Sequence, residues 1–360
     1  MLLALLALRP RAVTAGTGFV GVRVPAHPTA RALLEAARVP VAAPSANRFG
    51  HVSPTSAAHV LADLGHCPIA VVDPGGHGTT CDVGIESTVV GLGVGGTDLR
   101  VFRLGGAPLA ELSACARRAG LEVTVRLVGR ADQSQGAAPE DDGEADAPGE
   151  AGPDARGPGA EAEAEDGDGE ALEAPGQLLT HYAPDVPAAL CAWARPRRAA
   201  AAGAGGGAAA SSPAGACLVP LRGCRAPAAA LADTVVLDLG GHLRRAAGTA
   251  AGGDAGTQLP ALAYRSLDDP ASDWGDGAGA DGRRAGEAAA TSPAEAVAIS
   301  RRAVFASLRW AEAVPGARVV LLCDPLAVPG WKGVPGADAL RDRLFRAASG
   351  GFAGLSMGQA

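Results

Sequence analysis

One run of acidic and small residues sets the first limit on how this chain can fold. Residues 140–170 hold thirteen Asp or Glu and one Arg, so the local charge is −12 in a chain whose net charge is −7. The wider range 129–174 has almost no large apolar side chain, so it cannot bury enough surface to offset its ordering entropy. We therefore expect a disordered linker at 129–174 between two mildly basic folded bodies, residues 1–128 and 175–350.

Composition excludes several classes of protein. The 360 residues are 48% hydrophobic, which is enough for a core, and the length suits two domains. No apolar run approaches the roughly 20 residues that a membrane span needs, and we interpret the short amino-terminal run at 2–8 as a buried strand rather than a signal peptide. The seven Cys include no C-x-x-C pair, which indicates a reducing compartment, and neither they nor the His form a metal-ligand pattern. We predict no protein-bound metal.

Apolar periodicity predicts an α/β architecture in both bodies. In the first body, the predicted strands are 2–8, 19–24, 39–43, 69–73, 86–92 and 99–103, and the predicted helices are 28–38, 54–64 and 107–119. In the second body, the predicted strands are 216–220, 234–238 and 317–322, and the predicted helices are 293–313 and 337–348. Low-complexity insertions are expected at 199–214 and 247–290. Ser292, Pro293 and Glu295 form a typical start for the helix at 293.

The densest chemical signal is the segment Val39–Thr55, VPVAAPSANRFGHVSPT. Ser45 and Asn47 follow an apolar run, where ligand groups usually lie in α/β sheets. Ser53 precedes Pro54 and is a natural helix N-cap, and a helix amino terminus attracts phosphate. The plainer interpretation is that Ser53 only caps a helix and Asn47 only forms a turn.

Two arginines stand at apparent strand positions. Arg23 lies in the run Gly21–Pro25, and Arg103 precedes a Gly-Gly turn. A guanidinium there either grips an anion in a bidentate manner or points to solvent from an edge strand. Both interpretations stay open for Arg23.

Two further motifs are polar. The strand predicted at 86–92 begins with Glu86, Ser87 and Thr88 after a Gly-rich turn, but the spacing matches neither a P-loop nor a nucleophile elbow. We therefore expect no nucleophilic serine. After the linker comes His181-Tyr182-Ala183-Pro184, where an aromatic ring and an imidazole can fold over a ligand or simply mark the return of ordered structure.

In this order, these motifs resemble the threonylcarbamoyl-AMP synthase family. The quoted matches are VRVPAHP, APSANRFGHVSPTSAAHVLADL, DPGG, GIESTVV, RLGG and HYAP, with AISRRAVFASL and GADALRDRLFRAA in the second body. The resemblance implies a partial YrdC-like twisted α/β sheet at 1–128 followed by a small Rossmann-like α/β domain. It also implies synthesis of threonylcarbamoyl-AMP and pyrophosphate from L-threonine, bicarbonate and ATP with Mg²⁺, by positioning rather than by a catalytic nucleophile. The product would pass to a downstream tRNA threonylcarbamoyl-transfer complex in the cytoplasm or an organelle.

Carried over residue by residue, the resemblance implies two sets of ligands. Arg23, Ala43 and Ser87 would bind L-threonine. The ATP ligands would be Ser45, Asn47, Ser53, Arg103 and Tyr182.

Departures from the family pattern leave alternatives open. The family's PTET-type turn and K-x-R-P segment do not occur, and the chain opens at what should be a mid-domain strand, so we expect an incomplete catalytic domain. A second hypothesis is a non-catalytic homologue that binds RNA, including double-stranded RNA, or a partner protein. A third is the YrdC-like module of a carbamoyl-transfer protein that matures hydrogenases, against which the HYAP segment and the second body count.

Overall fold

The computed structural model describes residues 20–73, 83–92, 98–120, 124–127, 181–196, 217–221, 224, 226–245, 261–268, 290 and 292–357. The strand predicted at 2–8, the linker at 129–174 and the insertion at 199–214 lie outside these ranges. Within them, no helix is both long and apolar enough to cross a bilayer.

The carboxy-terminal body is built on a seven-stranded sheet in the order β6-β5-β10-β4-β9-β7-β8. Its strands are β4 (Ala188–Pro196), β5 (Cys217–Pro220), β6 (Ala229–Ala230), β7 (Thr234–Asp238), β8 (Ala263–Ser266), β9 (Val319–Cys323) and β10 (Phe352–Met357). The five strands from β10 to β8 run parallel, and β5 and β6 complete one edge in antiparallel fashion. Every residue of β7 and β9 is buried, as expected for strands inside a parallel sheet.

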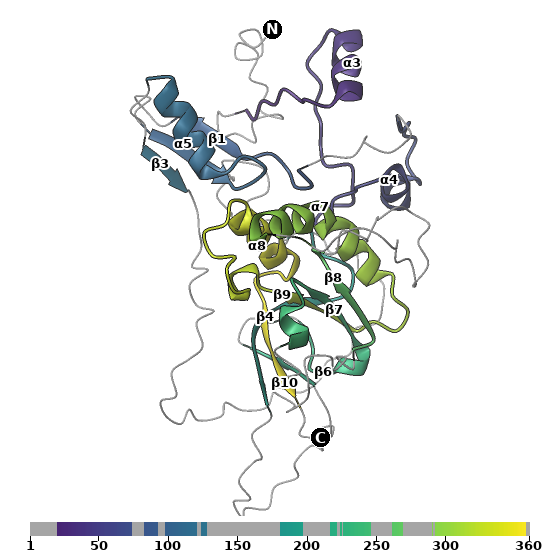
Figure 1. Cartoon of the computed structure of the whole chain (residues 1–360). Coiled ribbons are helices and arrows are strands. Elements are labelled where there is room, and N and C mark those ends of the chain that lie inside the picture. Colours follow the sequence, from purple (N-terminus) through teal and green to yellow (C-terminus); the bar gives the residue numbers. More distant parts are fainter. Residues whose placement is uncertain are drawn as a thin grey trace, which may run out of the picture.

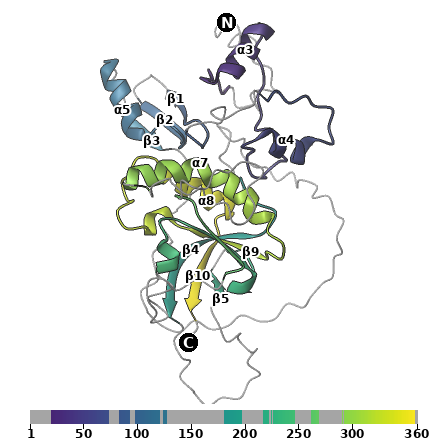
Figure 2. The ribbon, with the colours of Figure 1, turned by 45° about the vertical axis from the view of Figure 1, so that its right-hand side comes forward.

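Two helices lie across this sheet, between it and the amino-terminal elements (Figures 1 and 2). They are α7 (Pro293–Glu312) and α8 (Ala337–Ala347). The predicted start of α7 is confirmed, because Ser292 Oγ accepts a hydrogen bond from Glu295 N at 3.2 Å and Pro293 occupies the first turn. Both helices therefore present one side to the sheet and leave the other for the first body.

The first body contains three helices and a three-stranded sheet among its described residues. The helices are α3 (Pro28–Ala37), α4 (Ala57–Leu64) and α5 (Leu109–Arg118), and the strands are β1 (Val89–Leu92), β2 (Asp98–Arg103) and β3 (Thr124–Leu127). β2 pairs antiparallel with β1 and parallel with β3. No residue of α3 or α5 is buried, whereas Val52 and Ile85 belong to the hydrophobic cluster of the carboxy-terminal body. The described core is therefore continuous from one body to the other.

Several sequence predictions for the first body are wrong. Residues 20–24, 39–43 and 69–73 form no strand, because a strand needs a paired neighbour and none of the described segments pairs with them. The second helix starts at Ala57, capped by Ser56, so Ser53 is not its N-cap. The Ser53 hydroxyl instead donates a hydrogen bond to Glu86, described below.

In the carboxy-terminal body, the predicted strand at 234–238 and the predicted helices agree with β7, α7 and α8. Sequence analysis missed β4 and β10. It also placed 263–266 inside an insertion, whereas these residues form the edge strand β8. The rest of that predicted insertion lies outside the described residues, apart from a few flanking positions. The α/β fold class is confirmed.

Candidate functional site

Tyr182 is the centre of a buried polar site between the two bodies. Its side chain is 1% exposed, and its backbone is in the left-handed region at φ +64°, which is costly for a bulky residue. The centroid of the Tyr182 ring lies 3.9 Å from the centroid of the His181 ring and 5.2 Å from that of the Phe305 ring on α7. The guanidinium carbon of Arg343 on α8 lies 5.5 Å from the ring centroid, within cation–π range. Packing from three sides therefore holds Tyr182 in a strained backbone conformation.

Glu86 connects the first body to α8. One carboxylate oxygen accepts a hydrogen bond from Ser53 Oγ at 3.1 Å, and the other accepts from Arg343 Nε at 2.9 Å. Burial alone raises the pKa of Glu86, but the Arg343 charge, the hydrogen bonds to the carboxylate and the Arg103 charge together outweigh it, so the pKa is lowered. Glu86 is therefore ionised near neutral pH and joins Ser53 to Arg343.

Arg103 extends this site from the end of β2. Its Nη2 and Nε atoms donate to the carbonyl oxygen of Ser87, at 2.8 and 3.3 Å. Burial lowers the pKa of Arg103, and the adjacent Tyr182 phenol acts in the opposite direction. Ser53, Glu86, Ser87, Arg103, His181, Tyr182 and Arg343 are together called the Tyr182 site below.

The Tyr182 site is suited to an anionic ligand. Three buried polar atoms in it make no hydrogen bond with any described residue: Tyr182 Oη, His181 Nδ1 and Arg343 Nη2. Burial raises the pKa of Tyr182 to about 12 and lowers that of His181, so near neutral pH the phenol is an available donor. Unpaired donors beside guanidinium groups are the chemistry that recognises phosphate or carboxylate.

A second cluster lies where α4, α7 and the segment after Tyr182 meet. His51 Nδ1 lies 2.9 Å from Asp63 Oδ2, and His51 Nε2 lies 3.0 Å from Glu312 Oε2. Arg309 donates to both oxygens of Asp63 at 2.8 and 3.2 Å. Because both imidazole nitrogens face carboxylates, both bonds form only when the ring is doubly protonated. These residues, with Arg48 and Asp185, are called the His51 cluster.

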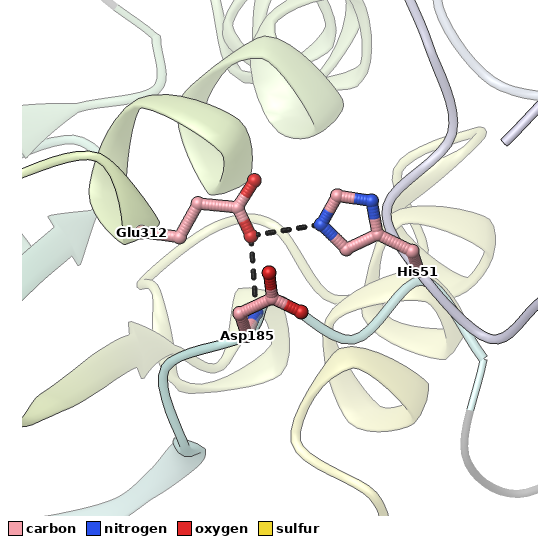
Figure 3. Close-up of side chains that lie close together, drawn as sticks. All are labelled: His51, Asp185 and Glu312. Carbon is pink, nitrogen blue, oxygen red and sulfur yellow. Dashed lines mark hydrogen bonds and ion pairs between the residues drawn. The ribbon is translucent and has the colours of Figure 1, made fainter. Parts of the chain in front are cut away.

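Part of the His51 cluster has the donor set of a metal site. Ligand atoms of His51, Asp185 and Glu312 lie within 4.8 Å of one another. Figure 3 shows how these three side chains face one another. Glu312 Oε2 already accepts from His51 and from the backbone N–H of Asp185, and an Asp185 oxygen accepts from Arg48 Nη2 at 2.8 Å. A divalent ion would have to displace these bonds, so the arrangement fits an ion-pair network better than a metal centre.

The structure gathers some of the predicted ligands and separates others. Ser53, Arg103 and Tyr182 meet in the Tyr182 site, whereas the exposed Ser87 contacts it through its backbone carbonyl. Asn47 instead anchors its own turn, donating to the carbonyls of Arg48 and His51 at 2.7 and 2.9 Å, while its buried Oδ1 has no partner among the described residues.

Three predicted ligands lie in exposed, irregular segments of the first body. Arg23, Ala43 and Ser45 are exposed, and they belong to segments outside every helix and strand of the first body. Their proposed roles therefore rest on the sequence match alone.

Sequence reasoning missed most of the charged residues that join the bodies. Glu86 was noted only as polar, and Arg343, Arg309, Glu312 and Asp63 were not singled out. Their partners lie as many as 261 positions away along the chain, as in the His51–Glu312 pair. The one available signal was the three Arg that each of α7 and α8 carries among its apolar residues.

The fold and the site together define an α/β protein whose two bodies enclose a cationic site around the segment that joins them. Two family models match the sequence. One, described as "Telomere recombination", matches residues 2–105, and the other, "Threonylcarbamoyl-AMP synthase, C-terminal domain", matches residues 150–349. The chain belongs to the threonylcarbamoyl-AMP synthase family.

Curated relatives match shorter stretches. The threonylcarbamoyl-AMP synthase of Bacillus subtilis is 49% identical over 84 residues, which is 23% of each chain. That of Pyrococcus abyssi is 43% identical over 103 residues, 29% of this chain and 28% of the relative. The matched regions therefore span under a third of these relatives' lengths. A crystal structure of P. abyssi Sua5 complexed with L-threonine aligns with 95% of this chain and 67% of its own, at 20% identity and a TM-score of 0.46.

Proposed function

We propose that this protein takes part in forming threonylcarbamoyl-AMP and pyrophosphate from L-threonine, bicarbonate and ATP, for threonylcarbamoyladenosine modification of tRNA. The observation that carries the proposal is the Tyr182 site. Three residues that the sequence match gives as ATP ligands come from segments far apart in the chain and gather around buried donors that lack a partner among the described residues, Tyr182 Oη and Arg343 Nη2. These three ligands are Ser53, Arg103 and Tyr182.

The reaction needs no protein nucleophile. The threonine amine adds to CO₂ from bicarbonate to give a carbamate, and a carbamate oxygen attacks the α-phosphorus of ATP while pyrophosphate leaves. The protein's contribution is to hold the reactants in line and to stabilise charge on the phosphates.

The charges of the site fit the proposed nucleotide. Arg103 and Arg343 supply positive charge, and Tyr182 supplies a hydroxyl donor that has no partner among the described residues. The one carboxylate of the site, Glu86, is already bonded to Ser53 and Arg343. Mg²⁺ would therefore be held chiefly by the phosphates, whose negative charge it would reduce.

The two ligand sets keep the roles that the resemblance gives them. Arg23, Ala43 and Ser87 are assigned to L-threonine. The residues assigned to ATP are Ser45, Asn47, Ser53, Arg103 and Tyr182. The product is labile and would be handed to a downstream tRNA threonylcarbamoyl-transfer complex.

Pyrophosphate release by the purified full chain tests the proposal. We expect release only when Mg²⁺-ATP, L-threonine and bicarbonate are all present, with threonylcarbamoyl-AMP detected by mass spectrometry. Arg23→Ala should raise the KM for L-threonine by a factor of tens, because it removes a carboxylate grip. Arg31→Ala, an exposed arginine on α3, is the matched control and should leave KM unchanged.

Two results would count against the proposal. ATP binding without pyrophosphate release would favour the non-catalytic hypothesis. Binding of RNA by the same preparation would then identify RNA as the ligand of the non-catalytic protein. An unchanged threonine KM in Arg23→Ala would refute the assignment of Arg23 alone.

A further inference from the structure

Arg343, in the middle of α8, is a fully buried charged residue. Its side chain is 0% exposed, although an unpaired buried charge is strongly unfavourable. Its Nη1 atom donates to Asp342 Oδ2 at 2.8 Å, and its Nε atom donates to Glu86 Oε2 at 2.9 Å. The first bond stays within α8, whereas the second crosses to the first body.

Through these contacts Arg343 reaches two of the proposed ATP ligands. Ser53 donates to Oε1 of Glu86, and Arg343 donates to Oε2 of the same carboxylate. The two residues therefore hold the carboxylate from two sides at once. The guanidinium also stands 5.5 Å from the Tyr182 ring centroid. A residue with a strained backbone, such as Tyr182, keeps its conformation only where packing with its neighbours compensates for the strain. Arg343 is one of these neighbours.

We propose that Arg343, a residue of the carboxy-terminal domain, is a positioning residue for nucleotide binding, because it orients Tyr182 directly and Ser53 through Glu86. This inference rests on the proposed function for the identity of the ligand. It gives the carboxy-terminal domain a part in the site beyond covering the sheet. In place of a passive contact between bodies, α8 sets the geometry of Ser53 and Tyr182, two of the proposed ATP ligands.

The competing interpretation is that Arg343 only holds α8 in place. The chain offers a matched control on the same helix. Arg341 is 7% exposed, and its Nε atom donates to both oxygens of Asp324 at 2.9 and 3.0 Å, inside the carboxy-terminal body. Replacing either arginine breaks a buried ion pair of α8, but only Arg343 contacts the Tyr182 site.

The first measurement is the Kd for Mg²⁺-ATP of the full chain, by calorimetry, for wild type, Arg343→Met, Arg343→Lys and Arg341→Met. We expect Arg343→Met to raise Kd at least tenfold and Arg341→Met to change it less than twofold. Arg343→Lys keeps the charge but loses the planar fork, so it should fall between them. If Arg343→Met does not fold, Arg343→Lys compared with Arg341→Lys gives the same contrast.

The second measurement reports on Tyr182 without nucleotide. The chain has two tyrosines, so ring-¹³C labelling gives two assignable signals, with Tyr264 on β8 as the internal reference. Arg343→Met should shift or broaden the Tyr182 signal and leave that of Tyr264 in place. Arg341→Met should leave the Tyr182 signal in place.

The outcomes separate the two proposals. Equal ATP affinity in Arg343→Met and Arg341→Met, or an unmoved Tyr182 signal in Arg343→Met, overturns the positioning role. A wild-type chain that binds ATP but releases no pyrophosphate overturns the proposed reaction, while the contrast between the two arginines still tests Arg343. A wild-type chain that binds no ATP overturns both.

Discussion

Asp63 shows how one buried residue ties the bodies together. Its side chain is 4% exposed, and it accepts hydrogen bonds from Arg309, from His51 and from the backbone N–H of Arg48. Burial by itself raises the pKa of Asp63, but the bonds from Arg309 and His51 outweigh it and hold the pKa well below its usual range. The folded state therefore favours the ionised form.

The first prediction concerns the acid dependence of stability. Because the pKa of Asp63 is lower in the folded than in the unfolded state, its contribution is complete above the unfolded value of about 4 and decreases as the pH falls below it. Asp63→Asn should lower the unfolding free energy at pH 7 by about 3–5 kcal/mol, because Arg309 loses its buried partner. Urea unfolding between pH 7 and pH 3 measures both effects, and the deficit of the variant should shrink toward pH 3.

Asp233 supplies the control for Asp63. Its carboxylate is 42% exposed and lies 3.7 Å from Arg318, and exposed pairs contribute little. Asp233→Asn should change stability by less than about 1 kcal/mol at every pH. A constant deficit of Asp63→Asn from pH 7 to pH 3 would contradict the assigned titration.

At the scale of elements, a close backbone contact fixes how the loop before β1 meets α7. Gly84 has φ +77°, and a Cβ atom at this position would clash with the Arg302 Cα and with the Arg301 carbonyl oxygen. The loop approaches the helix this closely because position 84 has no side chain. Two residues later the same loop delivers Glu86 to Arg343.

The second prediction is that Gly84→Ala separates this loop from α7. Both backbones would have to move, which should cost about 1–3 kcal/mol of overpacking beyond the cost of the left-handed conformation. Gly333→Ala is the matched control, since Gly333 has φ +81° but has open space where a Cβ atom would lie. Urea unfolding of the two variants measures the difference, and equal losses would show that the contact with α7 is unimportant.

At the scale of the whole molecule, the first body depends on the second. Its buried polar side chains, His51, Ser53 and Asp63, all bond groups on α7 or a carboxylate held by α8. Most of the exposed large apolar side chains of the described residues also belong to the first body, Val24 and Phe49 most strongly. The order of the first body should therefore decrease when its contacts with α7 and α8 are removed.

The third prediction tests this dependence with Arg309. Its guanidinium is 6% exposed, and it bonds Asp63 and the carbonyls of Val52 and Ser53. Arg309→Met should increase amide hydrogen exchange across residues 51–63 by at least about tenfold, while exchange in β7 and β9 changes little. Arg318→Met removes an exposed arginine and is the control. Equal exchange in both variants would mean that apolar packing alone joins the bodies.

The sequence by itself determined the α/β class, the helices at α7 and α8, and the family, because these depend on local periodicity, caps and contiguous motifs. It did not determine which elements of the first body pair, because strand pairing depends on neighbours that local patterns do not name. Only the tertiary structure decided that Ser53 bonds Glu86 rather than capping α4, and that Arg343 and Arg309 complete the polar contacts between the bodies. The physical reason is that an ion pair or a strained backbone is stable only where folding brings its partners together, and those partners lie hundreds of positions apart in the chain.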